Sequence, residues 1–219
     1  FIIISDDRDG QKIDPELQKY IDTNEKIFFE IIDPAIGLAH GRIIGLKKVK
    51  TPYVLLMEDD FKFTSKTKIE KLLDVIMSTS ASLVAGNTAK CDFFGLIRFY
   101  KKNRINILEH FEKLVYRNLK NHKSCFLVDV TKNFFVARVS DLLEIGGWNK
   151  YLKSGGLEDL FIRLKLNEKT VIVCPEIYIQ QIPEKIHTRL QRKYPVLRYK
   201  QILKKFWNID KMRFIKKII

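Results

Sequence analysis

The chain has 219 residues, enough for one ordinary domain with a substantial core, alone or with a small appendage. Hydrophobic residues make up 46%, with only 10 glycines and 6 prolines, which excludes a collagen-like or extensively disordered chain. The net charge of +14 favours an anionic partner: nucleic acid, an acidic membrane surface or a phosphorylated small substrate.

The cysteines and the chain start leave the cellular compartment open. Cys91, Cys125 and Cys174 are too far apart for a zinc-binding pattern and allow at most one internal disulfide. No run of about 18 apolar residues is present, so we expect no segment that spans a bilayer. The chain begins on Phe1-Ile2-Ile3-Ile4, which is typical of the middle of a strand. We therefore expect a fragment whose opening strand and any anchor lie upstream.

Strand-like and helical patterns alternate in the first part of the chain. The clearest helix spans residues 66–77, where apolar residues recur at i, i+3, i+4 and i+7 from Ile69, and Thr64 or Ser65 can cap it. The other elements predicted here are strands at residues 1–5, 27–32, 53–57 and 82–85 and a helix at 38–49. Such alternation predicts a parallel sheet with helices on its faces.

The pattern is looser in the second half. Residues 93–100 favour a strand, and residues 105–119 fit either a strand or a helix. Further on we predict a strand at 133–138, helices at 140–145 and 157–166, and strands at 170–174 and 177–179. We assign residues 1–182 to one catalytic domain and residues 183–219 to a basic tail rich in aromatic side chains.

Carboxylates follow predicted elements at three places. They are Asp6-Asp7, Glu58-Asp59-Asp60 and, after Gly155-Gly156, Glu158-Asp159. The carboxyl ends of parallel strands meet at one edge of a sheet, so we expect the first two groups to share a cleft. A pair of carboxylates can hold a divalent ion against a diphosphate, and a third can act as general base. Ordinary capping and solvation are the alternative for each group taken alone.

Further segments accompany these carboxylates. Residues 37–42 (Gly-Leu-Ala-His-Gly-Arg) begin a helix, residues 58–64 (Glu-Asp-Asp-Phe-Lys-Phe-Thr) contain the acidic triplet, and residues 133–138 (Asn-Phe-Phe-Val-Ala-Arg) form a strand. Together with Ser5-Asp6-Asp7 and the later Gly-Gly-x-Glu-Asp, they resemble nucleotide-sugar glycosyltransferases of the GT-A fold. They are most similar to the ganglioside-type β1,4-N-acetylgalactosaminyltransferases, and the resemblance extends from Phe1 to about Gln181.

The resemblance implies an α/β, Rossmann-like GT-A fold with a mixed, mostly parallel sheet flanked by helices, whose first strand is missing from this chain. It also implies an inverting, metal-dependent enzyme that transfers a sugar from UDP to a hydroxyl of a glycan or glycolipid, with N-acetylgalactosamine as the first candidate. A bacterial family-2-like transferase using another nucleotide sugar is the second hypothesis. A basic nucleic-acid-binding protein is the third, and no nucleic-acid-binding motif supports it.

For the donor, the resemblance implies that Asp6 or Asp7 contacts the uracil or ribose. Arg42 would lie over the base or the phosphates, which suits a guanidinium group. Glu58 or Asp59 would face the ribose and the sugar.

For the metal, the resemblance implies that Asp60, in a DXD-like motif, binds Mn²⁺ or Mg²⁺ and that the ion neutralises the leaving diphosphate. Many such transferases complete the metal shell with a C-terminal histidine. The matching position falls near Gln181, a poorer ligand than imidazole for a borderline metal, and His187 follows it. We therefore predict either His187 or Gln181 as the last ligand. The remaining histidines, His40, His110 and His122, are predicted at the surface.

For the acceptor, the resemblance implies a carboxylate at the start of the helix after Gly155-Gly156 that deprotonates the attacking hydroxyl. We predict Asp159 as this base, with Glu158 holding the acceptor, and keep the exchanged roles as the alternative. One of the two can also simply stabilise the helix dipole. Trp148 and the preceding Gly147 lie where acceptor sugars stack in similar enzymes, and a core or hinge position is the alternative for Trp148.

The basic tail suits peripheral contact with an anionic membrane surface, which agrees with a lipid-linked acceptor. The same pattern also suits RNA or a solvated C-terminal helix. By resemblance, the expected location is the Golgi lumen or membrane, and the alternative is the bacterial cytoplasm at the inner membrane. The expected partners are a UDP-sugar donor and a glycan or glycolipid acceptor, without nucleic acid.

Overall fold

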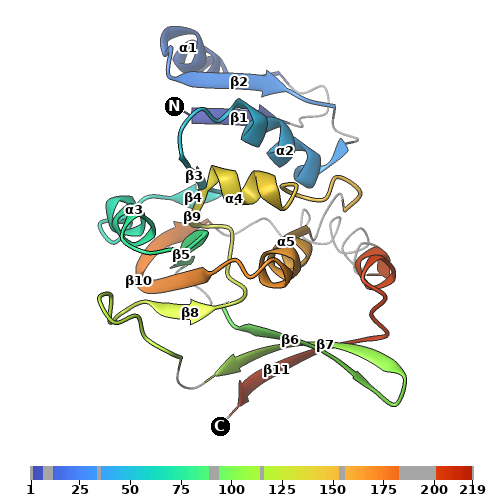
Figure 1. Ribbon diagram of the computed structural model, residues 1–219. Helices are drawn as coiled ribbons and strands as arrows, with labels where there is room; N and C mark the ends of the chain where they lie inside the picture. The colour runs from blue at the N-terminus through green and yellow to red at the C-terminus, as the bar shows by residue number, and fades with distance from the viewer. Residues whose placement is uncertain are drawn as a thin grey trace.

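A computed structural model describes residues 2–6, 12–33, 36–88, 94–113, 116–152, 156–182 and 201–218 (Figure 1). The helices are α1 (Pro15–Thr23), α2 (Leu38–Lys48), α3 (Ile69–Met77), α4 (Val139–Glu144) and α5 (Gly156–Leu166). The strands are β1 (Ile2–Asp6), β2 (Ile27–Ile31), β3 (Tyr53–Leu56), β4 (Phe61–Lys62), β5 (Leu83–Thr88), β6 (Leu96–Lys102), β7 (Ile105–Lys113), β8 (Phe126–Val128), β9 (Phe135–Arg138), β10 (Val171–Gln181) and β11 (Lys211–Ile218).

The central sheet has the strand order β3-β9-β5-β10-β4, with β8 also paired to β10. β5 and β10 are parallel, while β9 runs antiparallel to both β3 and β5. β3, β5 and β10 therefore point the same way, and β9 begins at the edge where they end. The parallel pair β1-β2 and the small sheet β11-β7-β6 lie at opposite ends of the molecule (Figure 1). This mixed α/β architecture confirms the predicted fold class. The sheet is less parallel than predicted, because β9 lies between β3 and β5 and runs against both, and β4 and β8 run against β10.

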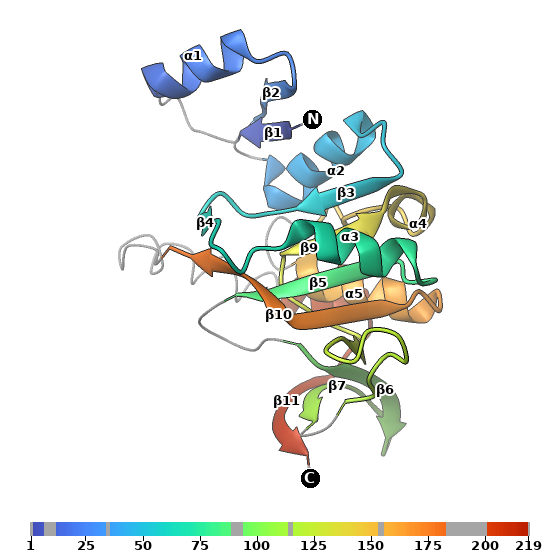
Figure 2. The same ribbon diagram turned by 90° about the vertical axis from the view of Figure 1, so that its left-hand side faces the viewer.

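Alternate residues of the central strands face opposite sides of the sheet and give the molecule two cores. On one side, Val84, Val136 and Ile172 pack with the apolar face of α3. On the other side, Leu83 and Phe135 belong to a larger core with α4 and α5. Figure 2 shows α3 in front of the sheet and α5 behind it. The sheet is therefore covered on both faces, and its polar contacts concentrate at the strand ends.

α5 is buried on nearly all sides because it lies between two sheets. Leu160, Phe161, Ile162 and Leu164 all have 0% exposure, although they do not form a single stripe on the helix. They share one core with residues of β5 and β10 and with Ile97 and its neighbours in the small sheet. A helix with apolar residues on all sides must pack against other elements on all sides. α5 is thus held from both sides.

The C-terminal segment, residues 201–218, belongs to this packing. It contains a short helix at 201–206 and then β11, which pairs in parallel with β7. Leu203 and Ile209 are only 1% and 4% exposed. Asp210 accepts a hydrogen bond from the backbone N–H of Asn106 at 2.7 Å, which ties the segment to β7. The predicted boundary after residue 182 therefore does not separate these residues from the rest of the fold, whereas residues 183–200 of the predicted tail lie outside the described part.

Two helix starts differ from the sequence prediction. α1 was not predicted, although Asp14 accepts from the backbone N–H of Glu16 at 2.9 Å and Pro15 occupies the first turn, both common signals of a helix start. α3 begins after Lys68, later than predicted, and has no side-chain cap. Thr64 instead forms a local turn, in which its backbone N–H donates to the Thr67 hydroxyl at 2.9 Å.

A disulfide between Cys125 and Cys174 links the start of β8 to β10. The two cysteines are 49 positions apart and both lie in the core beside α3. This agrees with the expectation of at most one internal disulfide. None of the helices in the described part of the chain has the length and apolar character needed to cross a membrane.

Candidate functional site

The acidic triplet lies where β3 ends and β9 begins. Leu56, the last residue of β3, pairs with Phe135, the first residue of β9. This register brings Glu58, just beyond β3, next to Asn133, just before β9. The place is the carboxyl edge of β3, β5 and β10, where the ligands of such sheets bind.

Arg42 and Asn133 both donate to the same oxygen of Glu58. Arg42 Nη2 lies 2.7 Å from Glu58 Oε1, and Asn133 Nδ2 donates to that oxygen as well. The Arg42 and Glu58 side chains are 10% and 24% exposed. Burial lowers the pKa of the Arg42 guanidinium, while the charge of Glu58 opposes this shift. The cluster therefore fixes a partly exposed carboxylate at the strand edge.

Trp148 lies beneath Arg42, in the turn after α4. Gly146 and Gly147 have φ values of 82° and 65°, which favour glycine, and the Gly147 N–H closes the end of α4 on the Leu142 carbonyl at 2.7 Å. The guanidinium carbon of Arg42 lies 5.7 Å from the centre of the Trp148 ring, which is 3% exposed. The predicted acceptor stacking does not fit this burial, because a stacking platform needs an open face. Gly147 likewise packs against α2.

Asp60 is held by the end of β10. Gln181 Nε2 donates to Asp60 Oδ2 at 2.9 Å, and the backbone N–H of Ile182 donates to the Asp60 carbonyl at 2.8 Å. The other carboxylate oxygen, Asp60 Oδ1, is buried and has no hydrogen-bond partner among the described residues. Such an oxygen is costly unless a cation or a donor meets it. Asp59, by contrast, is exposed.

We call Arg42, Glu58, Asp60, Asn133 and Gln181 the strand-edge site. Within the described ranges, no group of three or more histidine, cysteine or acidic side chains could hold a metal ion by itself. A metal at Asp60 would therefore take much of its shell from substrate oxygens, as magnesium and manganese commonly do.

Three predicted donor or metal residues lack a described side chain. Asp7 and His187 lie outside the described residues, and only the backbone of Asp6, at the end of β1, is described. Gln181, the other predicted candidate for the last metal ligand, donates its amide N–H to Asp60.

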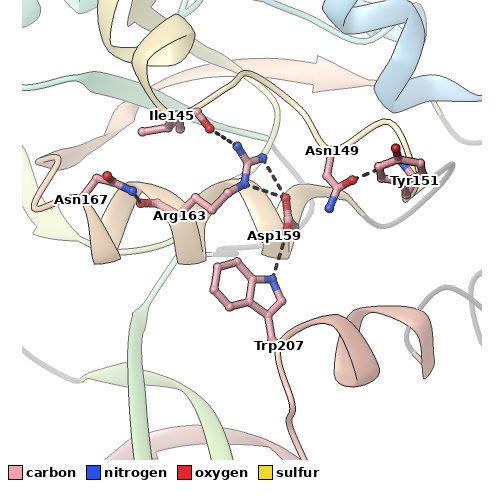
Figure 3. A network of polar contacts seen from close by, with 7 residues as sticks. All are labelled: Ile145, Asn149, Tyr151, Asp159, Arg163, Asn167 and Trp207. Carbon is pink, nitrogen blue, oxygen red and sulfur yellow. Dashed lines mark hydrogen bonds and ion pairs between the residues drawn. The ribbon is translucent and has the colours of Figure 1, made fainter.

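Asp159 lies in a network that engages both of its carboxylate oxygens (Figure 3). Oδ2 accepts from Arg163 Nε at 2.9 Å, and Arg163 Nη2 lies 2.7 Å from the same oxygen. Oδ1 accepts from Trp207 Nε1 at 2.9 Å. The Asp159 side chain is 0% exposed. The predicted role as base does not fit this geometry, because donors already engage both oxygens of this buried carboxylate.

Glu158, the preceding residue, has a different environment. It is half-buried and lines a small hollow of about 20 Å³ between α5 and the small sheet. Apolar residues such as Leu108 and Ile162 form much of the lining. His110, predicted at the surface, is half-buried in this lining, and burial lowers its pKa. Of the two predicted carboxylates, Glu158 is the one that lines this hollow.

Sequence reasoning missed several partners in these sites. The spacing of Asp159 and Arg163 at i and i+4 was a usable signal for their pairing. Asn133 was predicted only as part of a strand, and its contact with Glu58 follows from the antiparallel register of β9. Nothing in the sequence near Trp207 indicates a bond to α5.

The strand-edge site and the fold can be compared with known proteins. The family model described as glycosyl transferase family 2 matches residues 2–144, which include Arg42, Glu58, Asp60 and Asn133. The chain belongs to glycosyl transferase family 2. It is therefore a glycosyltransferase, as predicted.

This family-2 glycosyltransferase is similar to two proteins of Mus musculus. It is 30% identical over 159 residues to beta-1,4 N-acetylgalactosaminyltransferase 1, covering 66% of this chain and 27% of that protein. It is 33% identical over 111 residues to beta-1,4 N-acetylgalactosaminyltransferase 2, covering 50% of this chain and 21% of that protein. The chain thus spans about a quarter of the length of these relatives. The predicted family resemblance is confirmed.

Two solved structures show the same fold. The crystal structure of GalNAc-T7 with UDP, GalNAc and Mn²⁺ matches with a TM-score of 0.65 and 14% identity, covering 84% of this chain and 38% of that one. The structure of S. aureus TarS 1–349 matches with a TM-score of 0.55 and 13% identity, covering 82% of this chain and 50% of that one. At these identities the likeness shows the GT-A fold alone.

Proposed function

We propose that this glycosyltransferase transfers N-acetylgalactosamine from UDP to a hydroxyl of a glycan or glycolipid, with inversion and with a divalent metal. The observation that carries this is Asp60, whose buried Oδ1 has no partner among the described residues, beside the fixed carboxylate of Glu58. The relatives named beta-1,4 N-acetylgalactosaminyltransferase support the donor, and the neighbour with UDP, GalNAc and Mn²⁺ supports the metal.

The donor lies against the strand-edge site in this proposal. Arg42 holds Glu58 in place, and the exposed part of Glu58 accepts hydroxyls of the ribose or sugar. Asn133 Oδ1 is buried without a partner in the described part of the chain, so it is available to a hydroxyl or amide N–H of the sugar. Asp6 or Asp7 contacts the uracil or ribose in this proposal, and Asp59 remains the alternative to Glu58 at the ribose and sugar.

The residues present fit a divalent metal. Carboxylate and amide oxygens are the ligands that Mg²⁺ and Mn²⁺ prefer, and Asp60 Oδ1 and the Gln181 amide oxygen would supply them. When bound, the ion supplies positive charge that stabilises the leaving diphosphate. The Gln181 N–H holds the other oxygen of Asp60 and so orients the carboxylate.

Glu158 is the proposed base, and Asp159 supports it. A general base must lie within hydrogen-bond reach of the proton it removes. Glu158 borders the hollow between α5 and the small sheet, whereas both oxygens of Asp159 are engaged. The acceptor hydroxyl gives its proton to Glu158 and attacks the anomeric carbon opposite the leaving UDP. Attack from that side inverts the anomeric centre.

Calorimetric titration of the protein with UDP-GalNAc, UDP-GlcNAc, UDP-galactose and UDP-glucose, with and without Mn²⁺, tests the donor and the metal. We expect UDP-GalNAc to bind most tightly and only with the metal. Asp60→Ala should weaken this binding at least about tenfold, because it removes the proposed protein ligand.

Asp74→Ala is the matched control, because Asp74 is an exposed carboxylate on α3. It should bind UDP-GalNAc as the wild type does. Equal affinity with and without Mn²⁺, or full affinity in Asp60→Ala, would contradict the metal site. Tighter binding of another nucleotide sugar would contradict the donor.

We also propose the Golgi lumen as the location. Disulfides persist in oxidising compartments, so the Cys125–Cys174 bond favours a lumen over the bacterial cytoplasm. Exposed Phe206 and Phe214, which lie among basic residues of the C-terminal segment, support a peripheral membrane contact. Phosphatidylserine vesicles should co-sediment with the protein at low salt, and a failure to do so would contradict the membrane contact.

A further inference from the structure

Asp159 receives hydrogen bonds from two parts of the chain that are far apart in sequence. Arg163 binds it within α5, and Trp207 binds it from the C-terminal segment. The two donors lie on different sides of the carboxylate (Figure 3). Because Asp159 is next to Glu158, this carboxylate ties the turn that carries Glu158 to the C-terminal segment.

Trp207 is itself held in place by packing. Its ring centre lies 6.4 Å from that of Phe99 on β6 and 5.6 Å from that of Phe206. The indole packs against the core shared by α5 and the small sheet. The carbonyl of Asn208 accepts from Asn106 Nδ2 at 2.9 Å, which fixes the backbone that follows the tryptophan. The indole N–H is therefore presented to Asp159 from a fixed position.

The same network reaches the strand-edge site. Arg163 Nη1 donates to the carbonyl of Ile145, at the end of α4, at 2.5 Å. The chain then passes through the two glycines to Trp148, whose ring lies beneath Arg42. A continuous set of contacts thus joins the C-terminal segment, the helix with Glu158 and the arginine that holds Glu58.

We propose that Trp207 is a positioning residue, which acts through Asp159 to hold the first turn of α5 so that Glu158 meets the acceptor hydroxyl. Its role depends on the proposed function of Glu158 as the base. Displacing a reacting group by 1 Å can slow a reaction about a hundredfold, so a single hydrogen bond that sets this turn can matter for turnover. The C-terminal segment is then part of the active site.

Trp207→Phe keeps a ring in the core and removes the N–H donor. We expect kcat for transfer from UDP-GalNAc to a p-nitrophenyl β-galactoside probe to fall about tenfold, while the Kd of UDP-GalNAc with Mn²⁺ changes by less than about twofold. Tyr20→Phe is the control, because Tyr20 is 57% exposed on α1 and the change likewise keeps a ring and removes a donor, and both constants should stay at wild-type values. The positioning role would be overturned if kcat is unchanged in Trp207→Phe. It would also be overturned if the affinity for UDP-GalNAc falls by as large a factor as kcat does.

A double-mutant cycle of Trp207→Phe with Asp159→Ala, which removes the acceptor of the Trp207 N–H, tests whether Trp207 acts through Asp159. If it does, the double variant has the kcat of Asp159→Ala within about twofold. If the fold-losses of kcat in the two single variants multiply in the double variant, Trp207 acts independently of Asp159, which contradicts the proposed role. Benzothienylalanine at position 207 keeps the shape of the indole without its N–H and serves if the phenylalanine variant does not fold. A loss of about tenfold in kcat supports the role, and no loss contradicts it.

Amide hydrogen exchange needs no substrate. It therefore tests the role of Trp207 separately from the role of Glu158 as base. Loss of the Trp207 N–H should speed exchange about tenfold at the N–H groups of residues 160–163, which bond to the carbonyls of the first turn of α5, and leave α3 unchanged. Unchanged exchange and kcat in Trp207→Phe, together with a turnover that depends on Glu158, would overturn the positioning role alone. Normal turnover in Glu158→Gln would overturn the proposed base and with it the role of Trp207.

Discussion

Two arginine–carboxylate pairs in this glycosyltransferase have the same 2.7 Å contact but different surroundings. Glu58 is 24% exposed and belongs to the strand-edge site, where buried oxygens of Asp60 and Asn133 have no partner among the described residues. Asp159 is 0% exposed, and donors engage both of its oxygens. Unmatched buried oxygens can meet a ligand, whereas a saturated buried carboxylate holds neighbouring elements together. The partners of a carboxylate therefore separate a binding role from a supporting one.

The largest change in stability is expected from Asp159→Ala. It leaves the largely buried Arg163 and the Trp207 N–H without their shared partner, and removing one member of a buried ion pair costs about 3–5 kcal/mol. Chemical denaturation should show this loss, while the folded variant keeps its affinity for UDP-GalNAc. If Asp159→Ala instead weakens UDP-GalNAc binding and leaves stability unchanged, the Asp159 pair has a binding role, and its supporting role is contradicted.

Cys125→Ser is expected to have the next largest effect. The disulfide closes a long loop, and its loss should lower the free energy of unfolding by about 2–4 kcal/mol. Because the bond lies on the α3 side of the sheet, away from both arginine pairs, donor affinity should not change. Denaturation curves with and without a reducing agent check this. A reduced wild type as stable as the oxidised protein would rule out the stabilising role.

Glu58→Gln should destabilise the fold less than the two preceding changes and weaken donor binding more. The pair is partly exposed, so we expect a loss of about 1–2 kcal/mol in stability and at least about tenfold in UDP-GalNAc affinity. Glu30→Gln is the matched control, because the side chains of Lys48 and Glu30 are 35% and 37% exposed, more than those of the Arg42–Glu58 pair, and surface pairs contribute less than about 1 kcal/mol. Similar donor affinities in both variants would contradict a ligand-binding role for Glu58.

The smallest expected effect concerns Glu109 on β7. The Tyr100 hydroxyl donates to it at 2.6 Å and lowers the pKa of Glu109. A lowered pKa stabilises the fold above the ordinary value of 4.5, and this stabilisation is lost as the pH falls through the folded-state value. The stability difference between wild type and Tyr100→Phe should therefore shrink between neutral pH and values below 4.5. A difference that does not vary with pH would refute the assignment.

The strand-edge site was largely predictable because its signal is local. An apolar run that ends in Glu58-Asp59-Asp60 marks a buried strand and its carboxyl edge, and the structure places the triplet there. Asn133 was harder to predict, because β9 runs antiparallel and brings its start, rather than its end, to this edge. The register between two antiparallel segments that are far apart in the chain cannot be predicted from the sequence of either segment alone.

The C-terminal segment was not predictable for the same reason. Its basic residues and aromatics indicated a surface tail, yet β11 pairs with β7 and Trp207 reaches Asp159. Both contacts join residues far apart in sequence, so neither composition nor periodicity reports them. The choice between Glu158 and Asp159 depended on this unseen partner, since only the fold shows that Asp159 is enclosed.

The most direct test compares turnover in Glu158→Gln and Asp159→Asn, with donor binding measured in both. We expect Glu158→Gln to lose kcat about a thousandfold and to keep the wild-type Kd for UDP-GalNAc, because only the base is removed. Asp159→Asn should lose about tenfold, through poorer positioning of the first turn of α5. A larger loss in Asp159→Asn, with Glu158→Gln close to wild type, would contradict the separation of the two carboxylates.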